Sequence, residues 1–230
     1  MASQNPGIFR DFAESRNIAF HEIDLHAGES IPRLADFDGL WVMGGSMNVW
    51  EEDKYPWLIE EKKAIRHAVE DLKMPFLGIC LGHQLVAEAL GGEAKKTDNH
   101  EIGLFEIRPT PEGENHALLK NFNFSEKWVN VHLVEVTAPP RGSVILASSS
   151  QCNNHIMQAS ENAFSCQFHP EVCGHTFEGW MCIPGIPSSL ENLLGKEGLK
   201  NFQDEFKDNL SVNNKASHTL FNNWCDLVFN

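Results

Sequence analysis

The stretch MPFLGICLGHQLVAEALGG, residues 74–92, decides the fold, because an apolar run passes through two glycines around one cysteine into an amphipathic segment. The run PFLGI predicts a buried strand, and LGHQLVAEAL predicts a helix that ends at Gly91 and Gly92. Cys80 therefore lies on the strand-to-helix turn, at the centre of a G-x-C-x-G pattern. Small residues on both sides of a crowded turn are typical of an exposed nucleophile, and a helix N-terminus favours the thiolate. The alternative is a cysteine that serves as a small buried hydrophobe.

A second motif, CQFHPEV at residues 166–172, contains the groups that a thiolate nucleophile needs. The nucleophile requires a base, and the base requires an acceptor that orients it. His169 and Glu171 are two residues apart at the end of an expected strand, so their side chains point to the same side. Pro170 between them fits a strand end, because proline cannot donate to a ladder. The alternative is a core histidine and a solvated carboxylate.

A third motif, WVMGGSMNVW at residues 41–50, is an expected strand that runs into a Gly-Gly turn. Acyl transfer needs two donors aimed at the developing oxyanion. The backbone N–H groups of Gly45 and of Leu81, the residue after Cys80, are the candidates, and a plain tight turn is the alternative.

The chain as a whole alternates helices and strands and then becomes strand-rich. This pattern predicts an α/β fold with a mostly parallel sheet flanked by helices, a strand-rich insert and a helical C-terminal tail at 176–230. We expect one domain over residues 1–230, with a Pro-Gly turn and a helix within residues 1–17. The other expected elements are strands at 18–25 and 37–44, a helix at 56–72, and short strands at 103–110, 127–137, 143–150, 155–160 and 163–169.

Composition excludes several classes of function. Lys and Arg number 18 against 32 Asp and Glu, a formal charge of −14, which argues against nucleic acid or an anionic membrane as a partner. No apolar run approaches the roughly 20 residues of a membrane span, and no basic-then-apolar signal opens the chain. Six scattered cysteines are too few for a disulfide scaffold, so we expect a reduced cytoplasmic protein.

The three motifs together, GGS, GICLGHQ and FHPE in that order, resemble the class I glutamine amidotransferase domain from about residue 7 to about residue 175. The likeness is greatest to stand-alone, GMP-synthase-like members, and the family is related to γ-glutamyl hydrolases. The resemblance implies a flavodoxin-like fold and a triad in which Cys80 is the nucleophile, His169 the base and acid, and Glu171 the orienting carboxylate.

The resemblance also implies residues that bind substrate. Gln84 matches a contact to the α-end of glutamine, and Glu101 in HEIG matches a polar residue close to the substrate. His132 lies in a segment whose backbone helps to hold the α-carboxylate, although Leu133 replaces the usual glycine there. Ser46 completes GGS, where the family usually has GGP.

The implied activity is hydrolysis of the γ-glutamyl amide bond of glutamine, or of a small γ-glutamyl amide or peptide, through a γ-glutamyl thioester without metal or organic cofactor. The leaving group stays open between ammonia, an organic amine and an amino acid, and the oligomeric state is also open. A second reading is a glutaminase subunit that delivers ammonia to a separate synthetase, since the chain shows no phosphate-binding loop of its own.

Two further readings belong to other classes. The first is a zinc site, since thiols and imidazoles are present in sufficient number at Cys166, His169, Cys173 and His175. The second is a catalytically silent binding protein with the same fold. In the tail, the apolar positions predict core packing for most of their side chains. Some of these side chains are expected to line the mouth of the pocket and to accept an apolar leaving group, a role that Leu133 would also suit. These positions are Phe177, Trp180, Met181, Leu190, Leu193, Leu194, Phe202, Phe206, Leu220, Phe221, Trp224 and Val228.

Overall fold

The apolar run before Cys80 forms the central strand β2 (Phe76–Ile79) of the computed structural model, which describes residues 6–229. Every residue of β2 is buried, and the strand pairs in parallel with β1 (Leu40–Val42) on one side and β8 (Ala163–Cys166) on the other. Because the carboxyl ends of parallel strands meet at one edge, residues that follow these three strands converge there. The three sequence motifs follow these strands.

The other half of the sheet is antiparallel. Its strand order is β1-β2-β8-β7-β6-β4, and the pairs β8–β7, β7–β6 and β6–β4 are antiparallel. The two remaining strands, β3 and β5, pair only with each other as a long antiparallel ribbon. The predicted α/β class, with helices around a sheet and a strand-rich insert, is confirmed.

The elements are as follows. The helices are α1 (Phe9–Ser15), α2 (Trp57–Arg66), α3 (Leu81–Ala89), α4 (Pro111–Glu114), α5 (Thr176–Met181) and α6 (Ile186–Val228), and a π turn (His67–Asp71) continues α2. Short 3₁₀ turns cover Leu25–Ala27, Leu34–Asp36 and Ala117–Leu119. The strands not yet given are β3 (Glu93–Glu106), β4 (Arg108–Pro109), β5 (Lys127–Ala138), β6 (Val144–Ser148) and β7 (Ile156–Ser160).

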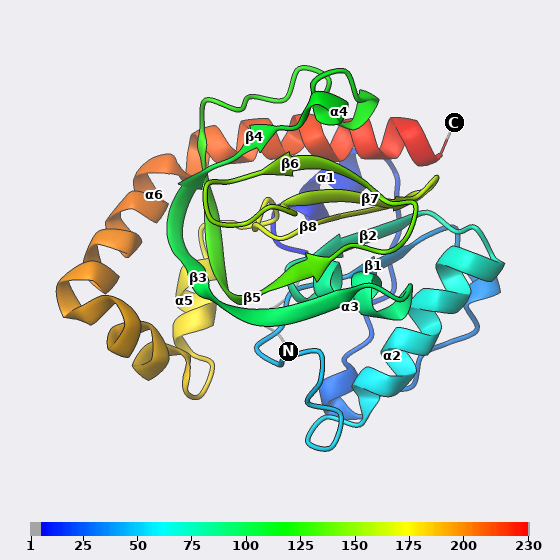
Figure 1. Ribbon diagram of the computed structural model, residues 1–230, viewed down its shortest axis with the longest axis horizontal. Coiled ribbons are helices and arrows are strands. Elements are labelled where there is room, and N and C mark those ends of the chain that lie inside the picture. Colours follow the sequence, from blue (N-terminus) through cyan, green and yellow to red (C-terminus); the bar gives the residue numbers. More distant parts are fainter. Residues whose placement is uncertain (1–5, 230) are drawn as a thin grey trace.

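Helices lie over the sheet (Figure 1), and two apolar clusters fill its two faces. On one face, α1 and the last part of α6 pack through side chains such as Phe9, Phe221 and Trp224. On the other face, α2, α3 and the β3–β5 ribbon pack through side chains such as Leu58, Leu85 and Val136. The sheet is therefore covered on both faces, and its strand ends remain available for a site.

The helical tail is confirmed, and it divides at Gly195, where the backbone leaves helical geometry with φ 72° and ψ 169°. A third apolar cluster joins α5 and the first half of α6 to the β3–β5 ribbon, with Trp180 and Phe206 among its members. None of the helices in the described part of the chain is long and apolar enough to cross a membrane.

The strand expected at 18–25 is wrong. Residues 18–24 are extended but belong to no strand, and a 3₁₀ turn begins at Leu25. Phe20 packs on Trp41 with ring centroids 5.8 Å apart, while His21 and Glu22 are exposed. The alternation of apolar and polar residues therefore reflects a half-buried segment without a ladder partner, which has the same pattern as an edge strand.

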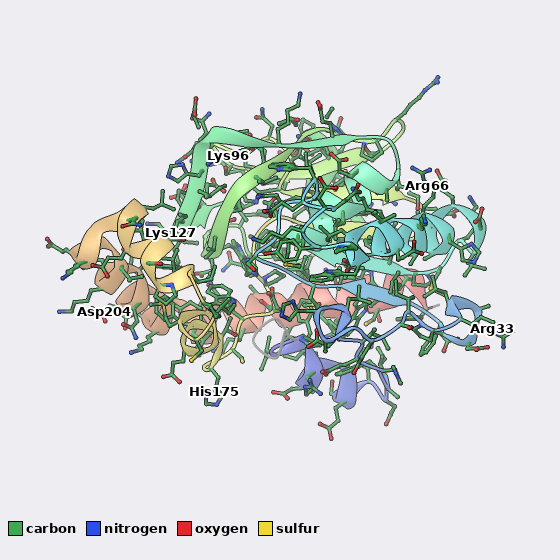
Figure 2. The ribbon with its side chains drawn as sticks, turned by 90° about the horizontal axis from the view of Figure 1, so that it is seen from below. Arg33, Arg66, Lys96, Lys127, His175 and Asp204 are labelled. Atoms are coloured by element: carbon green, nitrogen blue, oxygen red, sulfur yellow. The ribbon has the colours of Figure 1, made fainter. Side chains whose placement is uncertain are left out.

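Charged side chains lie around the outside of the molecule. The labelled Arg33, Arg66, Lys96, Lys127 and Asp204 come from separate elements and all are exposed (Figure 2). Charged side chains are also buried, among them Glu171, which follows β8 near the parallel strand ends where the motifs meet.

Candidate active site

Cys80 lies at a strained turn between β2 and α3, with φ 52° and ψ −102°. Positive φ is uncommon for a residue with a side chain, and such strain persists only where surrounding structure holds it. The Cys80 N–H donates to the carbonyl of Cys166 at 2.8 Å, and the Cys80 carbonyl accepts from the N–H groups of His83 and Gln84, each at 3.1 Å. These bonds fix the turn between β8 and the first turn of α3.

The glycines around Cys80 are required by close approach of the backbone. A Cβ at Gly82 would lie 2.0 Å from the carbonyl oxygen of Val42 in β1, and a Cβ at Gly78 would lie 2.7 Å from the carbonyl oxygen of Gly82. Real Cβ atoms do not approach other atoms so closely, so a larger residue at either place would push the turn apart. The G-x-C-x-G pattern is therefore the consequence of fitting this turn between neighbouring strands.

His169 and Glu171 form a buried pair directly after β8. His169 Nδ1 lies 2.7 Å from Glu171 Oε1, and the His169 N–H donates to the carbonyl of Val129 at 2.9 Å. The turn before α1 holds the backbone of Glu171 in place, because the backbone N–H of Ile8 donates to the backbone carbonyl of Glu171 at 2.8 Å. Gly7, with φ 52°, lies so close to that carbonyl that a Cβ there would be 1.9 Å from its oxygen.

The imidazole of His169 is adjacent to the Cys80 thiol. A Cβ at Gly44 would meet His169 Cε1 at 3.2 Å and Cys80 Cβ at 3.6 Å, so one glycine adjoins both. Burial alone would lower the pKa of His169, but the Glu171 carboxylate and the Cys80 sulfur outweigh it and raise the pKa to about 10. The site therefore favours an imidazolium at neutral pH beside a sulfur that can become a thiolate.

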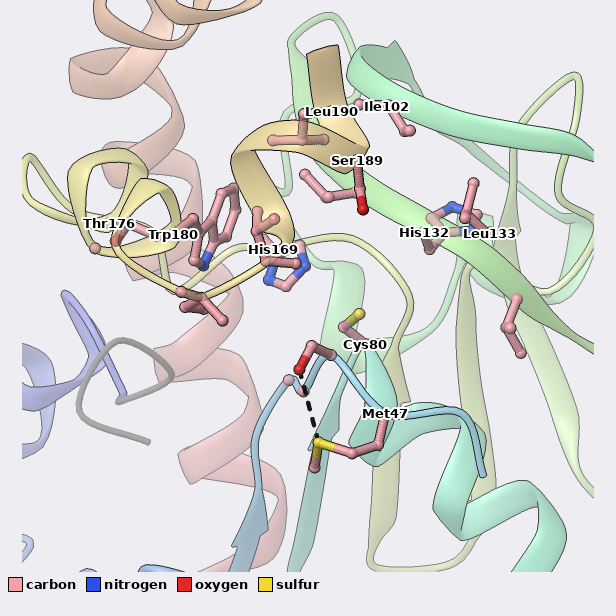
Figure 3. Close-up of a pocket in the computed structure, with 18 of the residues that line it drawn as sticks. Met47, Cys80, Ile102, His132, Leu133, His169, Thr176, Trp180, Ser189 and Leu190 are labelled. Carbon is pink, nitrogen blue, oxygen red and sulfur yellow. Dashed lines mark hydrogen bonds between the residues drawn. The ribbon is translucent and has the colours of Figure 1, made fainter. Parts of the chain in front are cut away.

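Gly45 and Leu81, whose backbone N–H groups are expected to hold an oxyanion, pack against each other, and Gly45 lines the same pocket as Cys80. Leu81 is the first residue of α3, and the first N–H groups of a helix have no partner within it. A Cβ at Gly45 would lie 2.4 Å from Leu81 Cδ2, so the Gly-Gly turn packs on the start of α3. Ser46 follows on the pocket wall, with its hydroxyl 3.8 Å from the sulfur of Met47 (Figure 3).

Gln84 is buried against the pocket and connects to the nucleophile through Gln167. Gln84 Nε2 donates to the Val134 carbonyl at 2.9 Å and to Gln167 Oε1 at 3.2 Å, which uses both amide hydrogens and leaves its oxygen for a substrate donor. Gln167 Nε2 lies 3.7 Å from Cys80 Sγ and donates to it. Sequence reasoning missed Gln167, although it lies within the second motif, two residues before His169.

Glu101 does not line the pocket, contrary to the expectation that its side chain is close to the substrate. It is 0% exposed and accepts hydrogen bonds from His132 Nε2 at 3.1 Å, His155 Nε2 at 2.7 Å and Ser149 Oγ at 2.6 Å. Burial would raise its pKa, but these donors lower it to about 2. His132 does line the pocket, so Glu101 lies behind the wall that His132 forms.

The zinc reading finds no support in the positions of its four residues. Cys166 and His169 are buried, whereas His175 is exposed and lies at the edge of the molecule (Figure 2). Among residues 6–229, the group whose possible ligand atoms do lie together is Glu101, His132 and His155, within 4.8 Å of one another. Those atoms are already joined by the hydrogen bonds described above.

The pocket over Cys80 has a volume of about 640 Å³ and is lined by both the motifs and the tail. Figure 3 shows Trp180 beside His169 on one side, and His132 and Leu133 on the other. The rings of His169 and Trp180 meet edge to face with centroids 5.0 Å apart. Of the apolar tail positions singled out from the sequence, Trp180, Leu190 and Leu193 line this pocket, and Ile183, Pro184 and Ile186 were missed.

Comparison with known proteins gives the same family as the motifs. A family model described as glutamine amidotransferase class-I matches residues 6–181. The A subunit of the glutamine-hydrolyzing GMP synthase of Sulfolobus acidocaldarius is 37% identical over 163 residues, covering 70% of this chain and 81% of that protein. A glutamine amidotransferase-like protein of Salmonella typhimurium is 32% identical over 180 residues, covering 76% and 74% respectively.

A solved structure extends the likeness to nearly the whole chain. The glutamine amidotransferase of Methylobacillus flagellatus superposes with a TM-score of 0.82 at 25% identity, covering 99% of this chain and 92% of that one. The chain belongs to the class I glutamine amidotransferase family.

Proposed function

We propose that this protein hydrolyses the γ-glutamyl C–N amide bond of glutamine or of a small γ-glutamyl amide, with Cys80, His169 and Glu171 as its catalytic triad. The observation that carries the proposal is the strained Cys80 turn beside the buried His169–Glu171 pair, whose Nδ1–Oε1 distance is 2.7 Å. Membership of an amidotransferase family supports the amide as the bond that is broken.

The first half-reaction forms a thioester. The Cys80 thiolate attacks the γ-carbonyl carbon, and the oxygen that becomes negative accepts hydrogen bonds from the N–H groups of Gly45 and Leu81. His169, as the imidazolium, gives its Nε2 proton to the amide nitrogen while the C–N bond breaks. The amine leaves with that proton, and a γ-glutamyl group remains on sulfur.

The second half-reaction regenerates the enzyme. Neutral His169 takes a proton from water as its oxygen attacks the thioester carbon, the C–S bond breaks, and glutamate leaves. Glu171 holds Nδ1 throughout, so the imidazole keeps Nε2 toward the sulfur and the imidazolium is stabilised. Both steps balance with the chain's own groups and one water.

The α-end of the glutamyl group is proposed to bind on the side of the pocket opposite Trp180. The Gln84 oxygen is available there as an acceptor, since both hydrogens of its amide are used by protein acceptors. His132 lines the same side, and Ser46 lies by the Gly-Gly turn. An ammonium group suits acceptors of this kind, and backbone N–H groups suit the carboxylate.

A glutamine-like diazo-ketone provides the test, because it alkylates only a thiolate that can attack a γ-carbonyl carbon. We expect it to label Cys80 and to stop glutamate release, with protection by glutamine. All six cysteines are free thiols, so peptide mapping compares Cys80 with five internal controls. Labelling that is equal at Cys166 or Cys225, or turnover retained in Cys80→Ala, would refute the triad.

A second candidate function is a glutaminase subunit that supplies ammonia to a synthetase. The similarity to the A subunit of GMP synthase from Sulfolobus acidocaldarius favours it, since that protein is one subunit of a glutamine-hydrolyzing synthase. Glutamate release by the isolated chain decides between the two. A rate that is negligible alone and rises many-fold on adding a synthetase subunit would favour the subunit role.

The surroundings in which the enzyme works are also part of the proposal. Free thiols throughout the chain suit a reducing compartment, which supports the cytoplasm. The net charge of −14 supports a small molecule as the ligand, with no nucleic acid or membrane as partner.

A further inference from the structure

The pocket is larger than glutamine requires, and the extra space is built by the tail. A cavity of about 640 Å³ falls within the range that holds drug-sized ligands, about 300–1,000 Å³, whereas glutamine is much smaller. The family model ends at residue 181, but the lining continues through Ile183, Pro184, Ile186, Leu190 and Leu193. This wall, the lining residues between 183 and 193, is therefore a feature beyond the region that the family model covers.

The position of His169 decides which part of a substrate would meet this wall. His169 donates its proton to the leaving nitrogen, so any substituent on that nitrogen starts next to the imidazole. Trp180 adjoins the same imidazole with ring centroids 5.0 Å apart, and the wall continues from Trp180 (Figure 3). The glutamyl half is held on the other side by Gln84 and His132, so the leaving group and the wall share one side.

The wall is apolar except for Ser189, and it is partly uncovered. Leu193 is 43% exposed. Ile183, at the other end of the wall, is buried with the neighbouring Trp180 in the apolar cluster that includes residues of the β3–β5 ribbon. An apolar ligand group would remove this exposed surface from water, and each buried methylene is worth about fourfold in binding, from about 0.8 kcal/mol.

The same side of the pocket offers little to a carboxylate. The described residues that line the pocket include no lysine or arginine. The N-terminus of α6 has few free donors, because the Ile186 N–H donates to the Ile183 carbonyl, Pro187 has no N–H, and the Ser189 N–H donates to the Gly185 carbonyl. A leaving amino acid would therefore meet no lysine or arginine with its α-carboxylate on this side, where the hydroxyl of Ser189 and the side chains of His175 and Thr176 are the polar groups of the lining.

We propose that the wall, with Trp180, is a subsite for the apolar group of a leaving amine, so that the preferred substrates are γ-glutamyl amides of apolar amines rather than γ-glutamyl amino acids. This inference rests on the proposed hydrolysis at Cys80 and names its substrate class.

The test uses two substrates that differ by one carboxylate. γ-Glutamyl-n-butylamide and γ-glutamylnorvaline have the same carbon chain on nitrogen, and norvaline adds the carboxylate. We expect kcat/KM for the butylamide to exceed that for glutamine by at least about tenfold, because several methylenes are buried. We expect γ-glutamylnorvaline to fall at least about tenfold below the butylamide.

Variants show whether the wall causes this preference. Leu193→Ala should lower the ratio of butylamide to glutamine in kcat/KM about tenfold, the scale of a lost apolar contact in a specificity pocket. Leu193→Arg should raise the ratio of norvaline to butylamide, since it supplies a cation. Leu227→Ala is the matched control, because Leu227 is a leucine of the same helix, 37% exposed and not part of the pocket lining.

The outcomes separate this inference from the proposed function. Glutamate release from glutamine at a rate equal to or above that from the butylamide would overturn the subsite and leave hydrolysis standing. No release from any γ-glutamyl compound would overturn hydrolysis, and calorimetry with Cys80→Ala would then decide the subsite. In that measurement the butylamide must bind at least about tenfold more tightly than glutamine, and equal affinities would refute the subsite.

Discussion

Replacing Glu101 by glutamine tests how the buried carboxylate supports the pocket wall. A carboxylate can only accept hydrogen bonds, so the three groups that contact Glu101, His132 Nε2, His155 Nε2 and Ser149 Oγ, all donate to it. A glutamine keeps the size but turns one acceptor into a donor. Ser149 Oγ already accepts from the N–H groups of Gln151 at 3.1 Å and Cys152 at 2.9 Å, so it cannot accept from the new amide.

The expected cost follows from that mismatch. One buried donor without an acceptor costs about 1–3 kcal/mol, and the bonds that remain lose the benefit of a full charge. We therefore expect Glu101→Gln to lower the free energy of unfolding by about 2–4 kcal/mol, and Glu101→Ala by about 3–5 kcal/mol because it leaves every donor unpaired. Glu106→Gln is the control, since Glu106 is exposed on the same strand, and should change stability by no more than about 0.5 kcal/mol.

Denaturant titration at several pH values measures both the size of the effect and its origin. The pKa of Glu101 is lowered from 4.5 to about 2, so its stabilisation is present above pH 4.5 and is lost as the pH falls toward 2. The difference between wild type and Glu101→Gln should therefore be constant near neutral pH and narrow below pH 4.5. A difference under about 0.5 kcal/mol at pH 7 would refute the carboxylate network. If a chelator instead lowers the free energy of unfolding of the wild type by a large amount, Glu101, His132 and His155 bind a metal ion.

Three other predictions concern the Cys80 turn and the proposed base, His169. His169→Ala should abolish glutamate release, and Glu171→Gln should retain more activity, because the carboxylate only orients the imidazole. Burial lowers the pKa of His169, but the neighbouring Glu171 carboxylate and Cys80 sulfur raise it to about 10, so the imidazolium charge stabilises the fold fully below pH 6.5 and progressively less up to about pH 10. As the pH rises from 6.5 to 10, denaturant titrations should show a smaller loss in the free energy of unfolding for His169→Ala than for wild type. Equal losses in the two proteins would contradict the raised pKa of His169. Gly82→Ala should cost more than about 2 kcal/mol, because its Cβ would lie 2.0 Å from the Val42 carbonyl oxygen, whereas Gly174→Ala, with nothing within 4 Å, should be near neutral by the same titration.

The turn at Cys80 could be predicted from sequence because its causes are local. Glycines two residues before and after Cys80 are needed where the turn crosses Val42 and its own first helical turn, and this requirement appears directly as a spacing. The start of α3 follows from the same short stretch. The pairing of His169 with Glu171 is also local in sequence, although both residues lie beyond the end of β8 at Cys166, where strand alternation no longer holds.

The role of Glu101 could not be predicted in the same way. A register shift between Lys96 and Glu101 interrupts the alternation along β3, so parity does not tell which face its side chain occupies. Two of its partners, Ser149 and His155, come from the ends of other strands far along the chain. The resemblance placed this residue close to the substrate, and packing across four segments places it behind the wall.

The tail shows a third kind of difficulty. Apolar periodicity identified its helices, but it does not tell which surface each apolar face meets. Leu190 lines the pocket, whereas Phe221, on the same long helix, packs under the sheet against Phe9. The break at Gly195, with φ 72°, separates these two destinations, and a single glycine in a helical pattern does not reveal how far the direction changes.

These differences have a consequence for how the site can change. The reacting groups depend on short motifs in which glycines and strained backbone leave little freedom, so substitutions there affect the chemistry itself. The wall depends on apolar side chains of a separate helix, and Leu193 at its rim is 43% exposed and constrained by few neighbours. Substitutions in 183–193 can therefore alter the accepted leaving group while the turn at Cys80 keeps its geometry. We therefore expect the leaving-group preference proposed for this chain to depend on the tail, where sequence motifs give the least information.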